Sequence, residues 1–443
     1  MDKLSVIGLG KLGACSAACF ASKGFEVIGV DINKQFVDAI NNDCAPVYEP
    51  RLQELINLSK GKLSATQDYE RAIRETEITF LIVPTPSRHD GHFSDKFLKD
   101  VLKHLSDALK KINKKYHLFV ITSTVSPGTT EENLIPLIEH HSEKKLNKDF
   151  GVCYNPEFIA LGNVITDSLN PDMVLIGESN KFAGNKLEEI YKVVCENDPY
   201  IARMSIISAE ITKISLNSYI TMKVSFANTL ANICEAISNA NIDDITKALG
   251  ADKRISPYYL KGGLSYGGPC FPRDNRAFAA FAQRYGVDAK LAKTTDEVNK
   301  FQINHLVDLV LKNIPNNESV ISVLGLAYKP NTPVIEESPA IKLTEELLRK
   351  GLKIIVYDPL AMDNVRSHFG DTVLYASSVK DCFNNASLCI ITTQADEFKD
   401  IDESCVINNS TTIIDCWRIL HPEKFNDKVK YIALGKAIRL GEQ

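Results

Sequence analysis

The first 31 residues arrange a short apolar run, a glycine-rich turn and a second apolar run in an order that few folds allow. Leu4 to Ile7 is typical of a buried strand, and Glu26 to Asp31 of the strand that follows it. Between them, Gly8, Gly10 and Gly13 open a segment with a helical pattern. Two parallel strands need a long crossover between them, and a helix supplies it. The chain is therefore predicted to begin as an α/β domain.

The three glycines also have the spacing of a dinucleotide-binding turn. Glycine allows a tight turn and lets the backbone approach a pyrophosphate at the helix N-terminus. Asp31 comes 18 residues after Gly13, where an acid can bind both ribose hydroxyls and would repel a 2′-phosphate, so NAD is expected rather than NADP. The simpler interpretation is that the glycines only pack a helix on a strand. The expected cofactor-binding residues are Gly8, Gly10, Lys11, Leu12, Gly13, Asp31 and Lys34, and for Lys34 a surface position is the alternative.

Further hydrophobic patterns divide the rest of the chain. Four apolar runs alternate with helical patterns, as in a parallel sheet covered on both faces; they cover residues 78–83, 118–121, 150–154 and 174–176. Residues 208–239 then form one long helical pattern with an apolar stripe, and residues 313–317 are a credible linker before a second α/β unit. We predict a doubly wound, Rossmann-type domain at 1–200, a central helical domain at 201–312 and a Rossmann-like α/β domain at 313–443.

Composition limits the partners and the compartment. The net charge is -5 and 24% of the 443 residues are charged, which argues against a nucleic-acid partner or an anionic membrane surface. Glycines and Lys11 interrupt the apolar stretch at 4–20, so it is not a secretory signal, and no run reaches the roughly 20 apolar residues of a membrane span. Eleven cysteines without a C-x-x-C pair are typical of reduced thiols and favour the cytoplasm. The histidines form no cluster, so no metal site is expected.

The segment from Gly262 to Asp274 is a glycine-rich loop that leads one cysteine to the predicted start of a helix. Pro272 suits the first helical position, which puts Cys270 just outside the N-terminus, where unpaired N–H groups favour an anion. The thiolate is the reactive form of cysteine. Asp274, four residues on, can face the same side as the thiol. We interpret Cys270 as a catalytic nucleophile; the alternative is a buried structural cysteine beside a flexible turn.

Other polar residues stand at predicted strand ends or on one helix face. Thr85 and Thr124 each follow a buried strand, so their hydroxyls emerge at the carboxyl edge of the sheet, where ligands bind; simple strand-end caps are the alternative. Glu157 also follows a strand and can act as a base, or can be an exposed loop carboxylate. Lys213 and Asn217 lie four residues apart on the long helix, opposite its apolar stripe. A charge and an amide donor there could hold a developing oxyanion, although most such pairs simply face solvent.

These motifs together resemble those of the UDP-glucose/GDP-mannose dehydrogenase family, whose members oxidise nucleotide sugars with NAD in a four-electron reaction. The likeness runs over nearly the whole chain. Its most specific part is Gly267-Gly268-Pro269-Cys270-Phe271-Pro272-Arg273-Asp274, close to the family's G-G-S-C-F-x-K-D. Further matches are Glu210-Ile211-Thr212-Lys213 with Asn217, Asn155-Pro156-Glu157-Phe158, and Tyr328-Lys329-Pro330 with Glu337-Ser338.

The resemblance implies a reaction in which Cys270 has a defined part. A first hydride transfer would turn the C6 alcohol into an aldehyde, the Cys270 thiol would add to it, and a second transfer would give a thioester that water hydrolyses to the uronate. The other catalytic residues that it implies are Lys213 and Asn217 for the oxyanions, Asp274 with Thr124 for the attacking water or for proton transfer, and Glu157 for acid/base roles. Thr85 and Thr124 would also contact the cofactor.

The resemblance also implies a substrate and an assembly. The substrate would be a UDP-sugar held partly by residues 313–443, with UDP-glucose ahead of a UDP-N-acetylhexosamine and both ahead of GDP-mannose. The residues expected to bind it are Glu157, Phe158, Ile159, Lys213, Asn217, Arg254, Lys261, Gly267, Tyr328, Lys329 and Arg418. A homodimer or a dimer-built oligomer is expected, consistent with the long helix.

The chain departs from the family pattern at three places. Leu161 stands where many members have a second glutamate, and Glu336 replaces the usual arginine before Glu337, so we expect altered contact with NAD. Asp415-Cys416-Trp417-Arg418 differs from the usual D-x-R, which leaves base and sugar specificity open. Two other functions are considered: a non-catalytic regulator that binds NAD and a sugar nucleotide, and a two-electron alcohol dehydrogenase. The catalytic residue set argues against the regulator, because binding alone needs no thiol.

Overall fold

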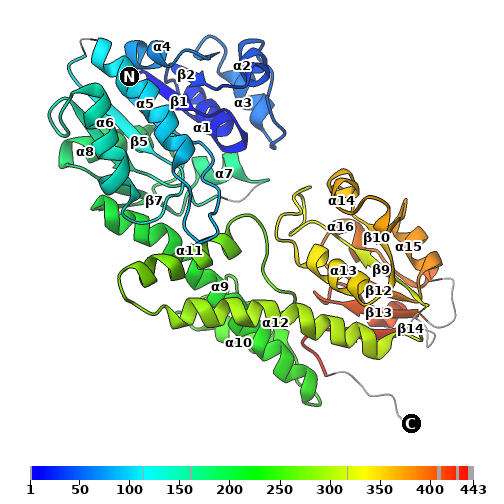
Figure 1. The fold of residues 1–443 in the computed structure, drawn as a ribbon. Coiled ribbons are helices and arrows are strands. Elements are labelled where there is room, and N and C mark those ends of the chain that lie inside the picture. Colours follow the sequence, from blue (N-terminus) through cyan, green and yellow to red (C-terminus); the bar gives the residue numbers. More distant parts are fainter. Residues whose placement is uncertain are drawn as a thin grey trace. The chain divides into compact units, whose positions relative to one another are not determined.

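The computed structural model describes residues 2–112, 114–159, 162–316, 318–406, 411–425 and 429–437. It divides into two compact units, residues 1–214 and 215–443, and the boundary falls inside the long helix α9 (Ile206–Ala236). Figure 1 shows the two sheets of the chain, one in each unit.

The first unit is an eight-stranded sheet covered by helices. Its strands are β1 (Leu4–Ile7), β2 (Val27–Val30), β3 (Leu63–Thr66), β4 (Ile78–Leu81), β5 (His117–Ile121), β6 (Phe150–Tyr154), β7 (Met173–Glu178) and β8 (Tyr200–Met204). Its helices are α1 (Lys11–Ser22), α2 (Lys34–Asn41), α3 (Leu52–Leu58), α4 (Tyr69–Glu75), α5 (Lys96–Lys111), the π-helical turn η1 (Thr130–Leu134), α6 (Ile135–Ser142), α7 (Val164–Leu169), α8 (Lys181–Val194) and the first part of α9.

The strand order is β3-β2-β1-β4-β5-β6-β7-β8, and its first six strands have the Rossmann order and are parallel. The prediction of a wholly parallel sheet is wrong at one place, because β7 runs antiparallel to β6. The ladder between the two strands is short, because it pairs only Cys153 with Glu178 and Tyr154 with Gly177.

Alternation along the strands builds two separate cores, one on each face of this sheet. In β5, Leu118 and Val120 pack in one cluster with helix α1, whereas Phe119 and Ile121 pack in the other with helix α5. Successive side chains of a strand point to opposite faces, so a strand that is apolar throughout must be covered on both. The continuous apolar runs in the sequence have this physical cause.

The second unit holds the rest of α9, three helices that precede the second sheet, and the sheet with the helices between its strands. The helices before the sheet are α10 (Ile242–Ala251), α11 (Phe271–Arg284) and α12 (Lys290–Asn313). The strands are β9 (Val320–Leu324), β10 (Lys353–Tyr357), β11 (Leu374–Tyr375), β12 (Leu388–Ile391), β13 (Thr411–Asp415) and β14 (Val429–Ala433). Between them lie α13 (Pro339–Arg349), α14 (Met362–Phe369), α15 (Val379–Asn385), α16 (Asp396–Lys399) and the 3-10 turns η2 (Gly370–Thr372), η3 (Glu403–Cys405) and η4 (Pro422–Lys424).

The two sheets repeat one design. The second has the order β11-β10-β9-β12-β13-β14 with every pair parallel, which matches the order of the first six strands. Gly325 follows β9 with φ +96°, as Gly8 follows β1 with φ +95°. The carboxylate of Asp358 after β10 accepts the N–H of Leu326 at 2.8 Å, as Asp31 accepts that of Leu9 at 2.6 Å. In both sheets an acid at the end of the second strand fixes the turn after the first.

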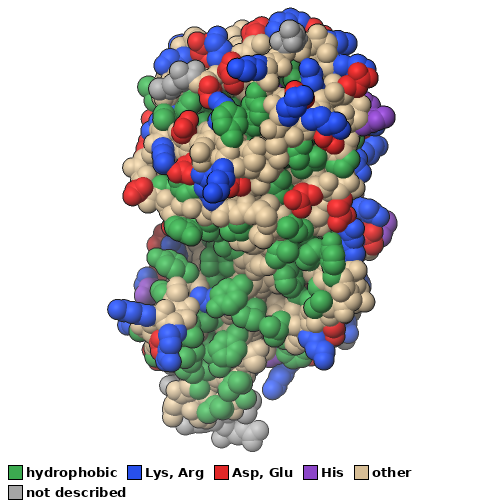
Figure 2. All heavy atoms as spheres, turned by 90° about the vertical axis from the view of Figure 1, so that its left-hand side faces the viewer, with side chains coloured by type: hydrophobic (Ala, Val, Ile, Leu, Met, Phe, Trp, Pro, Cys, Tyr) green, Lys and Arg blue, Asp and Glu red, His purple; other side chains and the backbone are tan. Residues whose placement is uncertain are grey.

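Helix α9 buries its polar face and exposes its apolar one. Lys213, Asn217 and Asn228 are at most 8% exposed, so this Lys/Asn pair does not face solvent. Tyr219, Phe226 and Ile233 on the other face are about half exposed, and so is Ile237, just after the helix. Figure 2 shows hydrophobic side chains gathered over part of one face of the molecule. The buried polar side chains of α9 therefore contact its own chain, whereas these apolar side chains form an exposed surface.

Candidate active site

The glycine turn after β1 has the shape that a dinucleotide requires. A Cβ atom on Gly13 would lie 1.8 Å from the carbonyl oxygen of Gly8, and Gly8 itself has φ +95°. A Cβ on Gly10 would meet nothing within 4 Å. The backbone is therefore closely packed at two of the glycines and open at the third, where helix α1 begins without a side-chain cap. Unpaired N–H groups there fit a pyrophosphate, so the residues present suit NAD.

Asp31 is fixed by the same turn. Its carboxylate accepts the N–H of Leu9 at 2.6 Å and the N–H of Asn33 at 2.7 Å. Lys34 is exposed and paired with Asp38 at 2.6 Å, Lys11 is exposed, and Leu12 is half-buried. The Asp31 carboxylate is therefore held just after β2, the position expected for a ribose contact. The side chains of Lys11 and Lys34 lie at the surface.

The Asp31→Asn variant is expected to bind NAD about tenfold more weakly and to discriminate less against NADP, because the charge that repels a 2′-phosphate is lost. Calorimetric titration with both cofactors measures the two dissociation constants. Asp107→Asn, an exposed aspartate on α5, serves as the control and leaves both constants unchanged. Equal constants in Asp31→Asn and the unaltered protein would contradict the assignment.

The two strand-end threonines lie against each other. The hydroxyl of Thr85 donates to the carbonyl of Thr124 at 2.7 Å, and the N–H of Val83 donates to Ser123 Oγ at 2.9 Å. Thr124 is partly exposed, whereas Thr85 is buried. The segments after β4 and β5 thus form one hydrogen-bonded edge, where the sequence placed the carboxyl end of the sheet.

Glu210 fixes the segment that continues from Thr124, a role that the sequence did not reveal. Its carboxylate is fully buried and accepts the N–H of Gly128 at 2.6 Å and that of Thr130 at 3.0 Å. Burial raises the pKa of Glu210 to about 7, and the hydrogen bonds from this segment oppose the rise. Glu210 lies on α9, one turn before Lys213, so the carboxylate links this helix to the segment after β5.

Lys213 holds the turn that carries Glu157. Its ammonium donates to the carbonyl oxygen of Glu157 at 2.7 Å and lies 4.5 Å from the centroid of the Phe158 ring. Ile159, the next residue, packs at the edge of the apolar cluster around α1. Lys213, Glu157 and Phe158 are therefore brought together, although 56 residues separate the lysine from the glutamate.

Cys270 is exposed at the first residue before helix α11, as the sequence predicts for a reactive thiol. The N–H of Asp274 donates to the carbonyl of Cys270 at 2.8 Å, which closes the first helical turn. A Cβ on Gly267 would lie 2.3 Å from the carbonyl of Glu337, and one on Gly268 would lie 2.5 Å from the ring of Tyr328. The glycines thus let the loop pack on the segment after β9, which a larger side chain would prevent.

Asp274 and Asn217 form a buried pair beside this thiol-bearing turn. Asn217 Nδ2 donates to Asp274 Oδ2 at 2.6 Å, and the aspartate is 1% exposed. Arg273 Nε lies 3.3 Å from the other carboxylate oxygen. Asn217 is one turn beyond Lys213 on α9, so this helix carries both of the predicted oxyanion donors.

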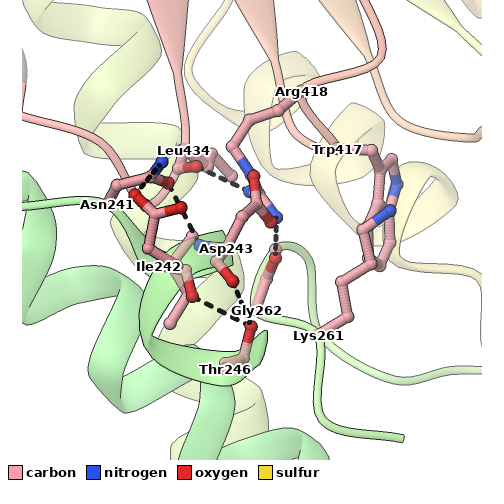
Figure 3. A network of polar contacts seen from close by, with 12 residues as sticks. Asn241, Ile242, Asp243, Thr246, Lys261, Gly262, Trp417, Arg418 and Leu434 are labelled. Atoms are coloured by element: carbon pink, nitrogen blue, oxygen red, sulfur yellow. Dashed lines mark hydrogen bonds and ion pairs between the residues drawn. The ribbon is translucent and has the colours of Figure 1, made fainter. Parts of the chain in front are cut away.

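Arg418 is held in a buried network, which Figure 3 shows. Its guanidinium forms a bidentate pair with Asp243 at 2.8 and 3.0 Å and donates to the carbonyls of Gly262 at 2.7 Å and Leu434 at 2.6 Å. The side chain is 3% exposed. Arg418 thus ties the loop before Cys270 to helix α10 and to the end of β14.

The other predicted substrate residues lie apart from this network or at its edge. Lys261 donates to Gln394 at 2.9 Å, and the Lys329 ammonium lies 5.8 Å from the ring centroid of Tyr328. Arg254 is paired with Asp252 and is 87% exposed. Trp417, one of the departures from the family pattern, donates to the carbonyl of Thr392 at 2.8 Å, and its ring would meet a Cβ on Gly263.

The other departures from the family pattern involve Leu161, Glu336 and the segment that begins at Asp415. Leu161 lies outside the described residues. Glu336 is exposed, and its neighbour Glu337 pairs with Arg276 at 2.8 Å. Asp415, the first residue of the altered D-x-R segment, accepts the N–H groups of Trp417 at 3.0 Å and Leu420 at 2.9 Å. It therefore shapes the turn that presents Arg418.

Among the described helices, none combines the length and the hydrophobicity that a membrane span requires. In the part of the chain that the structure describes, no group of three or more His, Cys, Asp or Glu could hold a metal ion. All eleven cysteines of the sequence lie within the described residues, and none of them is joined in a disulfide.

Comparison with known proteins agrees with this geometry. Sequence models of the UDP-glucose/GDP-mannose dehydrogenase family match residues 2–195 as the NAD binding domain, 207–301 as the central domain and 322–422 as the UDP binding domain. UDP-glucose 6-dehydrogenase AglM of Haloferax volcanii is 36% identical over 421 residues, covering 94% of this chain and 97% of the relative. GDP-mannose 6-dehydrogenase of Pseudomonas syringae pv. tomato is 36% identical over 360 residues, covering 80% of each chain.

Among solved structures, a UDP-glucose dehydrogenase from Pyrobaculum islandicum superposes with a TM-score of 0.90 at 30% identity, covering 99% of this chain and 98% of the other. The predicted α/β class and the NAD cofactor are confirmed by these matches. The chain belongs to the UDP-glucose/GDP-mannose dehydrogenase family and is an NAD-dependent nucleotide-sugar 6-dehydrogenase.

Proposed function

We propose that this protein oxidises the C6 hydroxyl of a UDP-sugar, UDP-glucose foremost, to the uronate through a thiohemiacetal and a thioester on Cys270. The observation that carries the proposal is the exposed Cys270 thiol at the N-terminus of α11, with the Asn217–Asp274 pair on the adjoining turn. The match of residues 322–422 to a UDP binding domain favours UDP over GDP. UDP-glucose is favoured because the relatives from Haloferax volcanii and Pyrobaculum islandicum bear its name.

In the first oxidation, the C6 hydroxyl loses its proton and C6 loses a hydride, which leaves an aldehyde. NAD, which the glycine turn after β1 and Asp31 would hold, would supply the hydride acceptor for both oxidations. The Lys213 ammonium and the Asn217 amide stabilise negative charge on the C6 oxygen, because a fixed charge and a fixed donor need no reorganisation as that charge develops. Their places on one helix, one turn apart, suit a shared target.

In the second oxidation, the Cys270 sulfur adds to the aldehyde carbon, and the aldehyde oxygen becomes a hydroxyl as it takes up a proton in place of the one that the thiol loses. Loss of a second hydride from C6 of this thiohemiacetal, together with the hydroxyl proton, gives the thioester. Water then adds to the thioester carbon, the C–S bond breaks, and the sulfur recovers a proton. Asp274 takes the proton from the water or orients it, and Glu157 supplies a second acid/base group. The sum is one alcohol, two NAD and one water converted into one carboxylic acid, two NADH and two protons.

Counting NADH per sugar tests the proposal. The panel contains UDP-glucose, UDP-N-acetylglucosamine, UDP-N-acetylgalactosamine, UDP-galactose and GDP-mannose. Two NADH per UDP-glucose, with a uronate product, is the expected result. One NADH with an accumulated aldehyde would point to the two-electron dehydrogenase, and NAD binding without turnover on any donor would point to the regulator. Preference for an N-acetylhexosamine donor would correct the sugar but keep the reaction.

The exposed apolar face of α9 supports a homodimer, which we propose as the working assembly. We also propose that the protein lies in the cytoplasm and that its three domains are divided near residues 200 and 312. The free cysteines and the need for NAD favour that compartment. The three family matches, which leave gaps near residues 200 and 310, favour that division.

The Phe226→Glu variant is expected to weaken self-association by about 100-fold or more, because a twofold interface meets the new charge twice. Light scattering during size-exclusion chromatography measures the mass over a range of concentrations. Phe182→Glu on α8 is the matched control, since Phe182 is 53% exposed and Phe226 is 54% exposed. Unchanged mass in both variants would contradict the use of this face.

A further inference from the structure

Ser16 connects the Glu157 carboxyl group to the helix that begins the dinucleotide site. Its hydroxyl lies 2.7 Å from Glu157 Oε1 and 3.0 Å from the carbonyl oxygen of Leu12, in the first turn of α1. Ser16 is 4% exposed. The second carboxyl oxygen, Oε2, is enclosed and has no hydrogen-bond partner among the described residues. Ser16 therefore provides a hydrogen-bond partner for only one of the two carboxyl oxygens of Glu157, namely Oε1.

The two contacts of Ser16 require a particular arrangement of protons. A hydroxyl group donates one hydrogen bond and accepts others, so Ser16 cannot donate to Leu12 and to Glu157 at once. If Glu157 is protonated on Oε1, the carboxyl donates to Ser16 and Ser16 donates to Leu12, and both short contacts are hydrogen bonds. If Glu157 is ionised, Ser16 must turn its proton to the carboxylate. The Leu12 carbonyl then keeps only the N–H bond of the helix.

The surroundings of the carboxyl group favour the protonated form. Cys15 and Cys19 face it from α1, Tyr191 faces it from α8, and Lys213 reaches the carbonyl of the same residue from α9. Burial raises the pKa of Glu157 to about 7, whereas the Ser16 hydrogen bond and the Lys213 charge lower it. A thiol and a phenol offer no charge that would stabilise a carboxylate at neutral pH, so Lys213 is the one cation in this set.

We propose that Ser16 is a positioning residue for Glu157, and that its hydroxyl reverses its hydrogen bond when Glu157 gives up its proton. The ionisation of Glu157 is thereby linked to the first turn of α1, because the Leu12 carbonyl gains or loses a bond with it. The proposal deepens the acid/base role given to Glu157 above and rests on it for its catalytic meaning. The proton equilibrium itself is a property of the protein without substrate.

Infrared titration of the full-length protein, without NAD or sugar, tests this. The carbonyl band of the protonated Glu157 side chain is identified by its loss in Glu157→Gln and followed from pH 5 to 9. Glu210 is the second carboxyl group whose pKa burial raises to about 7, so its band is identified separately in Glu210→Gln. The unaltered protein is expected to lose the Glu157 band near neutral pH.

The Ser16→Ala variant removes a donor that favours the carboxylate more than the neutral acid, so its midpoint is expected to rise by about half to one pH unit. Ser16→Cys, which keeps the volume with a weaker donor, is expected to show a smaller rise in the same direction and guards against a packing defect. Ser22→Ala is the matched control: Ser22 donates to the Cys19 carbonyl at 2.8 Å on the same helix without meeting a carboxylate. It leaves the midpoint unchanged.

A midpoint for Glu157 near the ordinary value of about 4.5, or a Ser16→Ala midpoint equal to that of Ser22→Ala, would overturn the proposal. The same rise should appear in the acidic limb of the kcat profile if Glu157 acts in turnover as a base. If the proposed function is wrong, the number of NADH formed per sugar will differ from two, while the Glu157 midpoint still rises in Ser16→Ala. If Ser16→Ala leaves the Glu157 midpoint unchanged while the unaltered protein still forms two NADH per sugar, the role proposed for Ser16 is wrong and the proposed function stands.

Discussion

Cys270→Ser is expected to form uronate at least about 1,000-fold more slowly than the unaltered protein, because a serine hydroxyl at this position cannot supply the readily formed thiolate. Binding of NAD and of UDP-glucose should stay within about threefold, since the side chain is exposed and close to serine in size. Mass spectrometry of the sugar product and calorimetry of both ligands give the two readouts.

Cys44→Ser is the matched control for this variant, because Cys44 is also an exposed free thiol. It should keep full activity. If Cys270→Ser releases uronate at the original rate, the proposed route through a thioester on Cys270 is contradicted. An aldehyde that accumulates in Cys270→Ser would instead place the block after the first oxidation, which is where the proposed chemistry first needs sulfur.

Lys213→Met is expected to lower kcat by about 100- to 1,000-fold, the usual cost of removing one oxyanion donor. Two effects add here, since the variant loses the charge that we propose acts on the C6 oxygen and the 2.7 Å bond that holds the Glu157 carbonyl. The affinity for NAD should change little, because Lys213 lies on α9 and not in the glycine turn. Steady-state kinetics that separate kcat from KM measure the effect.

Lys114→Met is the control for Lys213→Met. Lys114 is also partly buried and donates to backbone carbonyls, those of Ile73 at 2.7 Å and of Thr76, but it lies before β5, away from the predicted catalytic residues. A similar fall in kcat in both variants would mean that loss of a buried lysine destabilises the domain in general. A kcat within about threefold of the original in Lys213→Met would contradict its role at the oxyanion.

Most of the α/β elements could be predicted because their signals are local. The apolar run at 4–7 and the glycines after it coincide with β1 and the start of α1, and the run at 118–121 lies within β5. Strands such as β11, with two residues, and β14 were not predicted, because short edge strands with partly exposed side chains lack a continuous apolar run. The reversed direction of β7 leaves no mark in the strand itself, because parallel and antiparallel strands can carry the same apolar run.

The candidate site divides in the same way. Cys270 was found because a glycine loop and a proline adjoin it in the chain. Ser16 and Glu210 were missed as functional residues, because their partners, Glu157 and the segment at 128–130, are 141 and about 80 residues away. The only trace of Ser16 in the sequence is a hydroxyl among the small apolar residues of α1.

By itself, the sequence determined the alternation of strands and helices, the glycine turn with Asp31, and the thiol at a helix start, since each depends on residues close together in the chain. The tertiary structure alone decided which face of α9 is buried and which hydrogen bonds reach Glu157, Glu210 and Arg418. An apolar stripe on a helix has the same sequence pattern whether it packs inside the chain or lies exposed at the surface. The pKa of a carboxyl group follows from burial and from donors brought by distant segments, and only the folded chain supplies both.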